Sequence, residues 1–277
     1  MLAIVTDSVA CLPRELVERY RIHVVPVRIV RGERVYQDGV EVGPEEAFAW
    51  LAAGEVVTTS QPAVGTFVEL YRELAGHADG IVSIHVSSGV TGVYQAAVAA
   101  AAIVSNVPIA VIDSRAATMA EGFLVLEAAR LAEQGADLPS VQRRIEELRG
   151  LLRFFAVLET VAYLVRSGRA PWLAQLAVDV LQIKPILTLQ DGKIVSVGRV
   201  RTRRRAIEAM LERMERDVGD RPVHVAVLEA GARDDAEQLA DDVRRRFAVV
   251  ELYVTPFTAA MALHTGPGLL GLAYYAE

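Results

Sequence analysis

Short apolar runs alternate with stretches of helical periodicity through the first half of the chain. The apolar runs predict strands at residues 2–6, 22–30, 81–86 and 108–112. The periodic stretches predict helices at residues 13–20, 44–53, 67–74, 91–104 and 116–133. The spacing is clearest for Phe67, Leu70, Tyr71 and Leu74, which lie at i, i+3, i+4 and i+7. Strands that alternate with helices of this length predict a mainly parallel sheet covered by helices.

The pattern changes near Gly150, after a predicted amphipathic helix at residues 140–148. Two β-type stretches, 183–189 and 193–200, flank Asp191-Gly192, a dipeptide typical of a two-residue hairpin turn. Further helices are predicted at 202–217 and around 236–243, and strands at 223–228, 249–254 and 269–275. A hairpin combined with alternating elements predicts a mixed sheet with helices. We therefore expect two closely packed α/β domains, at residues 1–152 and 153–277.

The composition narrows the classes of function. The chain has 29 Lys and Arg against 35 Asp and Glu, a net charge of -6, which disfavours general nucleic-acid binding. A single cysteine, Cys11, forms neither an internal disulfide nor a cysteine-based zinc site and fits a reducing compartment. The first residues lack the basic and apolar regions of a signal peptide. We expect a cytoplasmic protein.

Two polar segments are candidates for a binding function, one directly after the first predicted strand and one before the predicted helix at 67–74. Thr6-Asp7-Ser8 stands where open α/β sheets place ligands, although an Asx-turn or a helix cap explains it equally well. Thr58-Thr59-Ser60-Gln61-Pro62 precedes the helix that contains Phe67. Ser60 is a candidate N-cap, and hydroxyls at a helix start favour an anion site, so a plain cap and a binding loop both remain open.

Two glycine-containing segments carry stronger signals. Ser87-Ser88-Gly89-Val90-Thr91-Gly92 leads from a strand into a helix, where glycines allow close backbone approach and the helix dipole favours negative charge. His264-Thr265-Gly266-Pro267-Gly268 places a histidine in a glycine-rich setting beside an apolar stretch. We favour a binding role for both segments.

Five arginines surround the predicted start of the helix at 202–217: Arg199, Arg201, Arg203, Arg204 and Arg205. Thr202 is the predicted N-cap, so three of these cations fall in the first helical turn, the end that the helix dipole disfavours for positive charge. A solvated face is the ordinary explanation, and recognition of an acidic partner is the alternative. A nucleic-acid regulator working through this cluster is disfavoured by the net charge.

Familiar catalytic signatures are absent from the sequence. Neither lysine, Lys184 nor Lys193, lies in a Gly-Lys-Ser/Thr phosphate loop, and no Gly-x-Ser-x-Gly elbow or metal-ligand spacing is present. We expect no catalytic residues, no metal and no cofactor. The alternative is a serine-dependent esterase or acyltransferase that uses Ser88, His264 and either Asp7 or Asp113.

Seven segments together resemble the DegV family of bacterial lipid-binding proteins. They are IVTDSVACLP (4–13), TTSQPAVGTF (58–67), SIHVSSGVTGVYQAA (83–97), VIDSRAATMAEGFLVLEAARLA (111–132), LQIKPILTLQDGKI (181–194), VRTRRRA (200–206) and HTGPGLLGLAYY (264–275). The resemblance implies two α/β domains with a long-chain fatty acid, such as palmitate, stearate or oleate, in a cleft between them.

The resemblance also implies roles for particular residues. The carboxylate would be held by Thr59, by Ser87 or Ser88, and by His264, with Ser60, Gly89, Thr265 and Gly266 beside them. The protein would be the binding subunit of a bacterial fatty-acid kinase, would contact membranes transiently, and would present the lipid to a separate kinase subunit that makes acyl phosphate for phospholipid synthesis. Arg201 and Arg203 match the segment implicated in docking that subunit.

Overall fold

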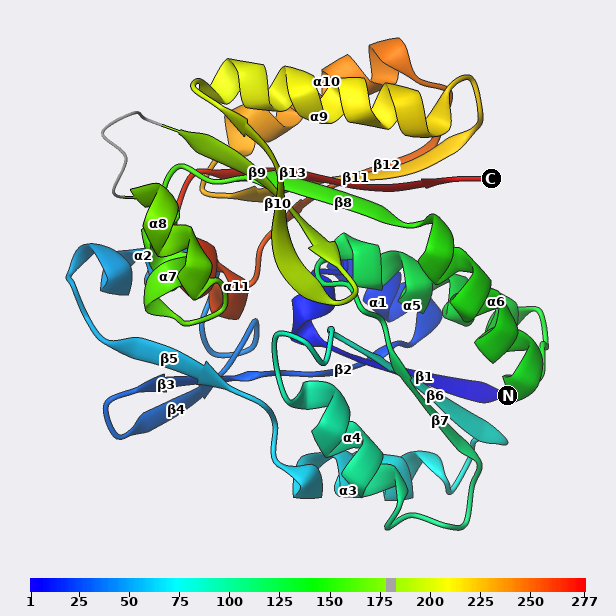
Figure 1. Cartoon of the computed structure of the whole chain (residues 1–277). Helices are drawn as coiled ribbons and strands as arrows, with labels where there is room; N and C mark the ends of the chain where they lie inside the picture. Colours follow the sequence, from blue (N-terminus) through cyan, green and yellow to red (C-terminus); the bar gives the residue numbers. More distant parts are fainter. Residues whose placement is uncertain (178–182) are drawn as a thin grey trace.

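A four-stranded parallel sheet forms the centre of the N-terminal half. The computed structural model describes residues 1–177 and 183–277, so the first two residues of the segment 181–194 lie outside it. The strand order is β2-β1-β6-β7, with β1 Leu2–Asp7, β2 His23–Val25, β6 Gly80–His85 and β7 Ile109–Asp113. Helices α3 (Val64–Leu74) and α4 (Val93–Ala101) cover one face. The other face carries α1 (Arg14–Tyr20), α5 (Met119–Glu133) and α6 (Leu138–Leu151) (Figure 1).

The predicted single strand at residues 22–30 is wrong. Pro26 interrupts it, because proline has no N–H to donate to a sheet ladder. The chain before Pro26 forms β2, whereas the chain after it joins a separate antiparallel sheet of order β4-β3-β5. The strands of this small sheet are β3 Arg28–Arg31, β4 Arg34–Gln37 and β5 Val57–Ser60. Ser60 is therefore a strand residue and not an N-cap, since α3 is capped at Ala63.

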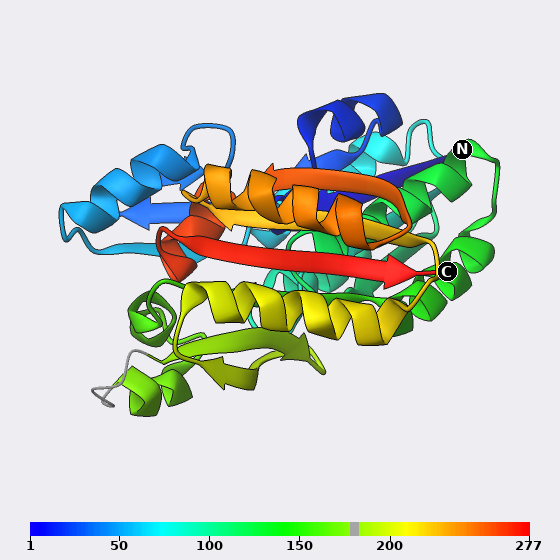
Figure 2. The ribbon, with the colours of Figure 1, turned by 90° about the horizontal axis from the view of Figure 1, so that it is seen from above.

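A six-stranded mixed sheet forms the C-terminal half, in the order β10-β9-β8-β13-β11-β12. Its strands are β8 Arg153–Val157, β9 Lys184–Gln190, β10 Lys193–Val200, β11 Val223–Ala230, β12 Val249–Pro256 and β13 Leu269–Ala276. Helices α9 (Arg203–Val218) and α10 (Arg233–Arg246) pack on its outer face (Figure 2). The hairpin turn at Asp191-Gly192 is confirmed: both residues have positive φ, and Gln190 pairs with Lys193.

Helices α5 and α6 lie between the two large sheets and contact both (Figure 1). Arg130 of α5 donates two hydrogen bonds to Glu251 of β12, at 3.0 and 2.6 Å, and so links the two halves. At the opposite side of the molecule, α11 (Ala259–Thr265) packs against α2 (Pro44–Ala52) and α7 (Ala162–Arg166). Two short turns of helix, Pro171–Leu173 and α8 (Ala174–Ala177), follow α7. The predicted fold class, two α/β units with a mainly parallel and a mixed sheet, is confirmed.

Candidate functional site

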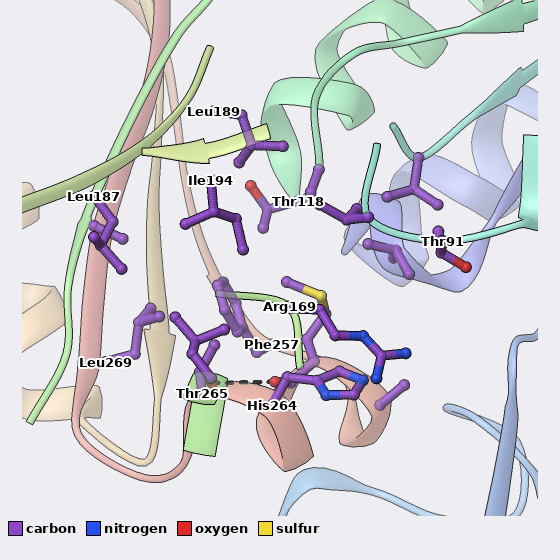
Figure 3. Close-up of a pocket in the computed structure, with 18 of the residues that line it drawn as sticks. Thr91, Thr118, Arg169, Leu187, Leu189, Ile194, Phe257, His264, Thr265 and Leu269 are labelled. Carbon is purple, nitrogen blue, oxygen red and sulfur yellow. Dashed lines mark hydrogen bonds between the residues drawn. The ribbon is translucent and has the colours of Figure 1, made fainter. Parts of the chain in front are cut away.

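A largely apolar cavity lies between the two halves (Figure 3). It holds about 920 Å³ of empty space between its wall atoms, with its open mouth included. Its apolar lining comes from both halves: Val9, Val27, Val86, Val90, Ala117, Phe154, Ala156, Leu158, Leu164, Leu187, Leu189, Ile194, Phe257, Ala260, Met261 and Leu269. A site built this way excludes water from most of any ligand that enters it.

Three polar side chains from distant parts of the chain meet in the cavity wall. Thr59 Oγ1 lies 2.7 Å from His264 Nε2, and Arg169 Nη2 donates to the same Thr59 oxygen at 3.3 Å. Within the described residues, Arg169 has no carboxylate partner at salt-bridge distance; its other hydrogen bond goes to the carbonyl of Ser167. Among the described residues, no carboxylate neutralises the positive charge of this group.

The protonation of this group suits an anionic ligand. Burial, and after it the positive charge of Arg169, lowers the pKa of His264 to about 3, so its ring is neutral near pH 7. Thr59 Oγ1 accepts from Arg169, and it can accept a second hydrogen bond if His264 carries its proton on Nε2. The hydroxyl proton of Thr59 is then free to donate into the cavity. The guanidinium and the hydroxyl are then the donors for a carboxylate, and the imidazole orients the hydroxyl.

Helix α11 sets the position of His264, which lies in its last turn and not in a loop. Asp38, a buried residue beyond β4, accepts from the backbone N–H of Ala260 in the first turn of α11, at 2.9 Å. Ser8 donates to the other Asp38 oxygen at 2.6 Å. The helix ends at Gly266, where φ is +70° and the backbone lies against the ring of Tyr163.

The structure brings some of the predicted binding residues to the cavity and leaves others away from it. Thr59, Ser60, His264 and Thr265 line it. Ser87, Ser88, Gly89 and Gly266 do not. The Ser87 hydroxyl donates to the Gly192 carbonyl at 2.8 Å, and the Ser88 hydroxyl donates to Asp113 at 2.5 Å. From the same loop, Thr91 is the hydroxyl residue in the cavity wall.

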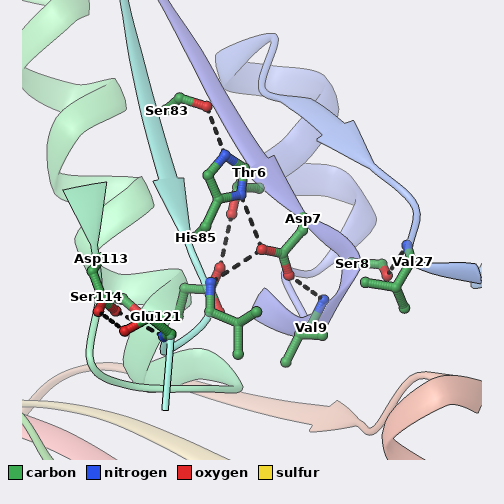
Figure 4. Close-up of polar contacts among 12 residues, drawn as sticks. Thr6, Asp7, Ser8, Val9, Val27, Ser83, His85, Asp113, Ser114 and Glu121 are labelled. Carbon is green, nitrogen blue, oxygen red and sulfur yellow. Dashed lines mark hydrogen bonds and ion pairs between the residues drawn. The ribbon is translucent and has the colours of Figure 1, made fainter. Parts of the chain in front are cut away.

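The arrangement expected for an esterase is not assembled. Ser88 is bonded to Asp113 and His264 to Thr59, so these two side chains do not form a nucleophile and base pair. A hydroxyl–imidazole–carboxylate chain does occur elsewhere: Ser83 Oγ lies 2.7 Å from His85 Nε2, and His85 Nδ1 lies 3.0 Å from Asp7 (Figure 4). All three side chains are fully buried within the N-terminal half.

Asp7 has a structural role in this network. Its carboxylate accepts from the backbone N–H groups of Val9 and Val86, each at 3.0 Å, and so joins the ends of β1 and β6. The Asx-turn considered for Thr6-Asp7-Ser8 is the arrangement observed. Glu121 of α5 accepts from Thr6 at 3.2 Å, and burial raises the pKa of its carboxyl well above the usual range.

The two predicted docking arginines differ in their surroundings. Arg201 is exposed beside the start of α9. Arg203 is half-buried: its side chain donates to Asp235 at 2.7 Å and to the carbonyl of Gly268 at 2.5 Å. Thr202 caps α9 as predicted, accepting from the Arg205 N–H at 3.2 Å. The cations in the first turn are thus partly compensated, since Arg205 pairs with Glu212.

Four polar residues of the cavity wall were not predicted as site residues: Thr91, Thr118, Arg169 and Thr188. Arg169 lies in an irregular stretch with no motif around it, and its contact with Thr59 spans 110 positions. Thr118 precedes α5 with φ +62° and ψ -155°, a conformation that glycine ordinarily adopts and that costs of order 1–3 kcal/mol. A Thr-x-x-Glu pattern at 118–121 is a signal for a helix cap, not for a cavity wall.

The described residues contain neither a membrane-spanning helix nor a cluster of metal-ligating side chains. In the ranges 1–177 and 183–277, no helix is both long and apolar enough to cross a membrane. Over the same ranges, His, Cys, Asp and Glu side chains form no group of three or more that is suited to a metal ion.

Comparison with known proteins gives consistent matches over the whole length. The model of the DegV family, described as an uncharacterised protein family, matches residues 1–277. Protein DegV of Bacillus subtilis is 33% identical over 276 residues, which cover 99% of this chain and 98% of that protein. A DegV family protein from Thermus thermophilus, described as fatty acid binding, superposes with a TM-score of 0.94 at 32% identity, covering 100% of this chain and 99% of the other. The structure of DegV from Bacillus subtilis, described as a fatty acid binding protein, gives 0.92 at 31% identity, covering 100% and 99%.

Proposed function

The chain belongs to the DegV family, and we propose that it binds one long-chain fatty acid, such as palmitate, stearate or oleate, in the cavity between its halves. The observation that carries the proposal is the polar group at Thr59, His264 and Arg169 in the wall of a largely apolar cavity. A cavity of this kind suits a ligand with one anionic head and a long apolar chain. The related structures described as fatty acid binding support the same ligand class.

The energetics favour an acyl chain. Each buried methylene contributes about 0.8 kcal/mol, so about 14 methylenes contribute about 11 kcal/mol before the cost of association. The head group adds little net affinity but must not lose its hydrogen bonds on burial. In this proposal Arg169 supplies the charge, and the Thr59 hydroxyl, the neutral His264 ring and Thr91 fix the position of the carboxylate.

Lipid extraction tests the proposal directly. The purified protein is extracted with organic solvent and the extract is analysed by mass spectrometry, and the lipid-free protein is then titrated with stearate. We expect a fatty acid in the extract and saturable uptake with one ligand per chain. A lipid-free extract together with no uptake of stearate contradicts the proposal.

Arg169→Gln tests the head-group assignment. Loss of a charge-assisted hydrogen bond weakens binding by about 1.5–3 kcal/mol, roughly tenfold to 150-fold in Kd. Arg166→Gln is the matched control, since Arg166 lies three positions earlier, is exposed, packs on the ring of Tyr163 and does not line the cavity. Equal affinities of the two variants for stearate would place the carboxylate elsewhere.

We further propose that the protein is a carrier without catalysis of its own. It presents the fatty acid to a separate kinase subunit, which forms acyl phosphate for phospholipid synthesis. The exposed Arg201 supplies a charge for docking, and Arg203 contacts the carbonyl of Gly268, four residues after His264. A partner bound over these arginines would therefore lie against the segment that continues from His264.

A reconstituted kinase assay tests the docking role. With a purified fatty-acid kinase subunit from the same genome, Arg201→Glu is expected to raise the concentration of carrier needed for half-maximal acyl phosphate formation. Its affinity for stearate is expected to stay at the wild-type value. Arg216→Glu, at the exposed far end of α9, is the control. If the two variants support equal rates at every carrier concentration, Arg201 does not dock the kinase.

A further inference from the structure

One hydroxyl in the cavity wall is not used by the head-group site. Thr118 is fully buried and lines the cavity, yet its Oγ1 has no hydrogen-bond partner among residues 1–177 and 183–277. Thr188, which lies in β9 of the six-stranded sheet, also has a hydroxyl in the cavity wall. That hydroxyl donates to the Phe154 carbonyl at 2.5 Å. A buried hydroxyl without a partner is costly and rare, so Thr118 needs an explanation.

The sequence around Thr118 predicts a helix-capping hydrogen bond that the structure does not contain. Thr118-Met119-Ala120-Glu121 has the sequence of a capping box. In that motif the threonine hydroxyl accepts from the backbone N–H of the third helical residue, and the glutamate side chain accepts from the backbone N–H of the threonine. In the structure Thr118 makes no side-chain cap bond, and Glu121 bonds to Thr6. The positive φ of Thr118 accounts for this, because a capping residue has extended backbone.

The hydroxyl also stands apart from the carboxylate site. Figure 3 shows Thr118 away from His264 and Arg169. A water molecule in this largely apolar cavity would find few of the two to four polar partners that hold buried water. A hydroxyl attached to an acyl chain needs only one partner, since the chain itself supplies the apolar contacts.

We propose that Thr118 is a polar subsite along the acyl cavity and that it selects long-chain fatty acids that carry a hydroxyl group on the chain. The proposal rests on the fatty-acid binding proposed above and deepens it by naming a substrate class. The unsubstituted acid leaves Thr118 Oγ1 unpaired, whereas a hydroxy acid pairs it. The preference should depend on where the hydroxyl stands along the chain, because Thr118 is fixed relative to the head-group site.

The test compares stearate with a series of hydroxystearates that differ only in the position of the hydroxyl. Each acid displaces a fluorescent fatty acid from the lipid-free protein. We expect at least one isomer to bind about threefold to tenfold more tightly than stearate. Thr118→Val should abolish this advantage without weakening stearate, and Thr118→Ser should keep it. Thr188→Val is the matched control: it removes a cavity-wall hydroxyl that is already paired, and it should preserve the ratio of the two affinities.

Thermal unfolding of the lipid-free variants separates ligand selection from a structural role. If the hydroxyl faces only the cavity, Thr118→Val leaves the Tm unchanged or raises it, whereas loss of a helix cap lowers it.

Any of four results overturns the proposal. The first two are that no hydroxystearate binds more tightly than stearate and that the advantage persists in Thr118→Val. The other two are that Thr118→Val weakens stearate binding as much as hydroxystearate binding and that it lowers the Tm. Failure of the wild-type protein to bind stearate at all defeats the proposed function and this inference with it.

Discussion

Acid should destabilise the lipid-free protein through His264 more than through an ordinary histidine. The pKa of His264 is lowered to about 3, from an ordinary value of 6.5, by burial and by Arg169. Between these two pH values the unfolded chain binds a proton that the folded chain does not. The free energy of unfolding therefore falls as the pH falls from 6.5 towards 3. Above pH 6.5 both states carry a neutral ring, and the effect vanishes.

The size of the effect follows from the linkage relation. One pH unit corresponds to about 1.36 kcal/mol, so lowering the pH from about 7.5 to about 5.5 costs about 1.4 kcal/mol through His264 alone. His264→Gln removes the titrating ring and keeps an N–H donor for Thr59. The variant should lose about 1.4 kcal/mol less stability over the same interval.

Urea unfolding of the lipid-free protein at the two pH values measures this difference. His77→Gln is the control, because His77 is exposed, and the same substitution there should preserve the pH dependence of the wild type. Equal losses in wild type and His264→Gln would refute the reasoning. Saturation with stearate extends the test, since a carboxylate beside the ring favours its protonated form and should lessen the acid sensitivity.

Three further substitutions test individual contacts of the fold by urea unfolding. Gly266→Ala forces a Cβ into the ring of Tyr163 at positive φ and should cost about 2 kcal/mol or more, against about 1 kcal/mol for Gly135→Ala, which faces open space at positive φ; equal losses would contradict the contact. Arg130→Gln leaves Glu251 without its bidentate partner and should cost about 1–3 kcal/mol, whereas the exposed Arg14→Gln should change nothing measurable. Tyr71→Phe removes one hydrogen bond to Ser83, which keeps its bond to His85, and should cost about 1 kcal/mol; a loss above about 3 kcal/mol would show that the network is cooperative.

The sequence predicted the elements whose signal is local. The helix at Phe67 and Tyr71 and the hairpin at Asp191-Gly192 follow from side-chain period and turn geometry, which neighbouring residues determine. The strand at 22–30 failed although its composition was suitable, because the missing N–H of Pro26 outweighs the β-branched residues around it.

The site was predictable only in part, because its contacts are long-range. Thr59 and His264 belong to segments that resemble a family, and the structure brings them within hydrogen-bond distance. The sequence identified the loop at residues 87–92 as a binding segment, but it did not show which of its side chains face the cavity. Ser87 and Ser88 turn to Gly192 and Asp113, while Thr91 faces the cavity. Arg169 has no local signal, because only the folded chain places it beside Thr59.

The cavity between the two halves should make the stability of the folded protein depend on whether a ligand occupies it. Wall atoms around an empty cavity lack packing partners on one side, and a bound chain supplies them from both halves at once. Any ligand that binds only the folded state raises its stability with the logarithm of ligand concentration. If the cavity binds fatty acid as proposed, resistance of the protein to proteolysis should rise with the concentration of fatty acid, and the amount of protein would then follow the amount of its ligand.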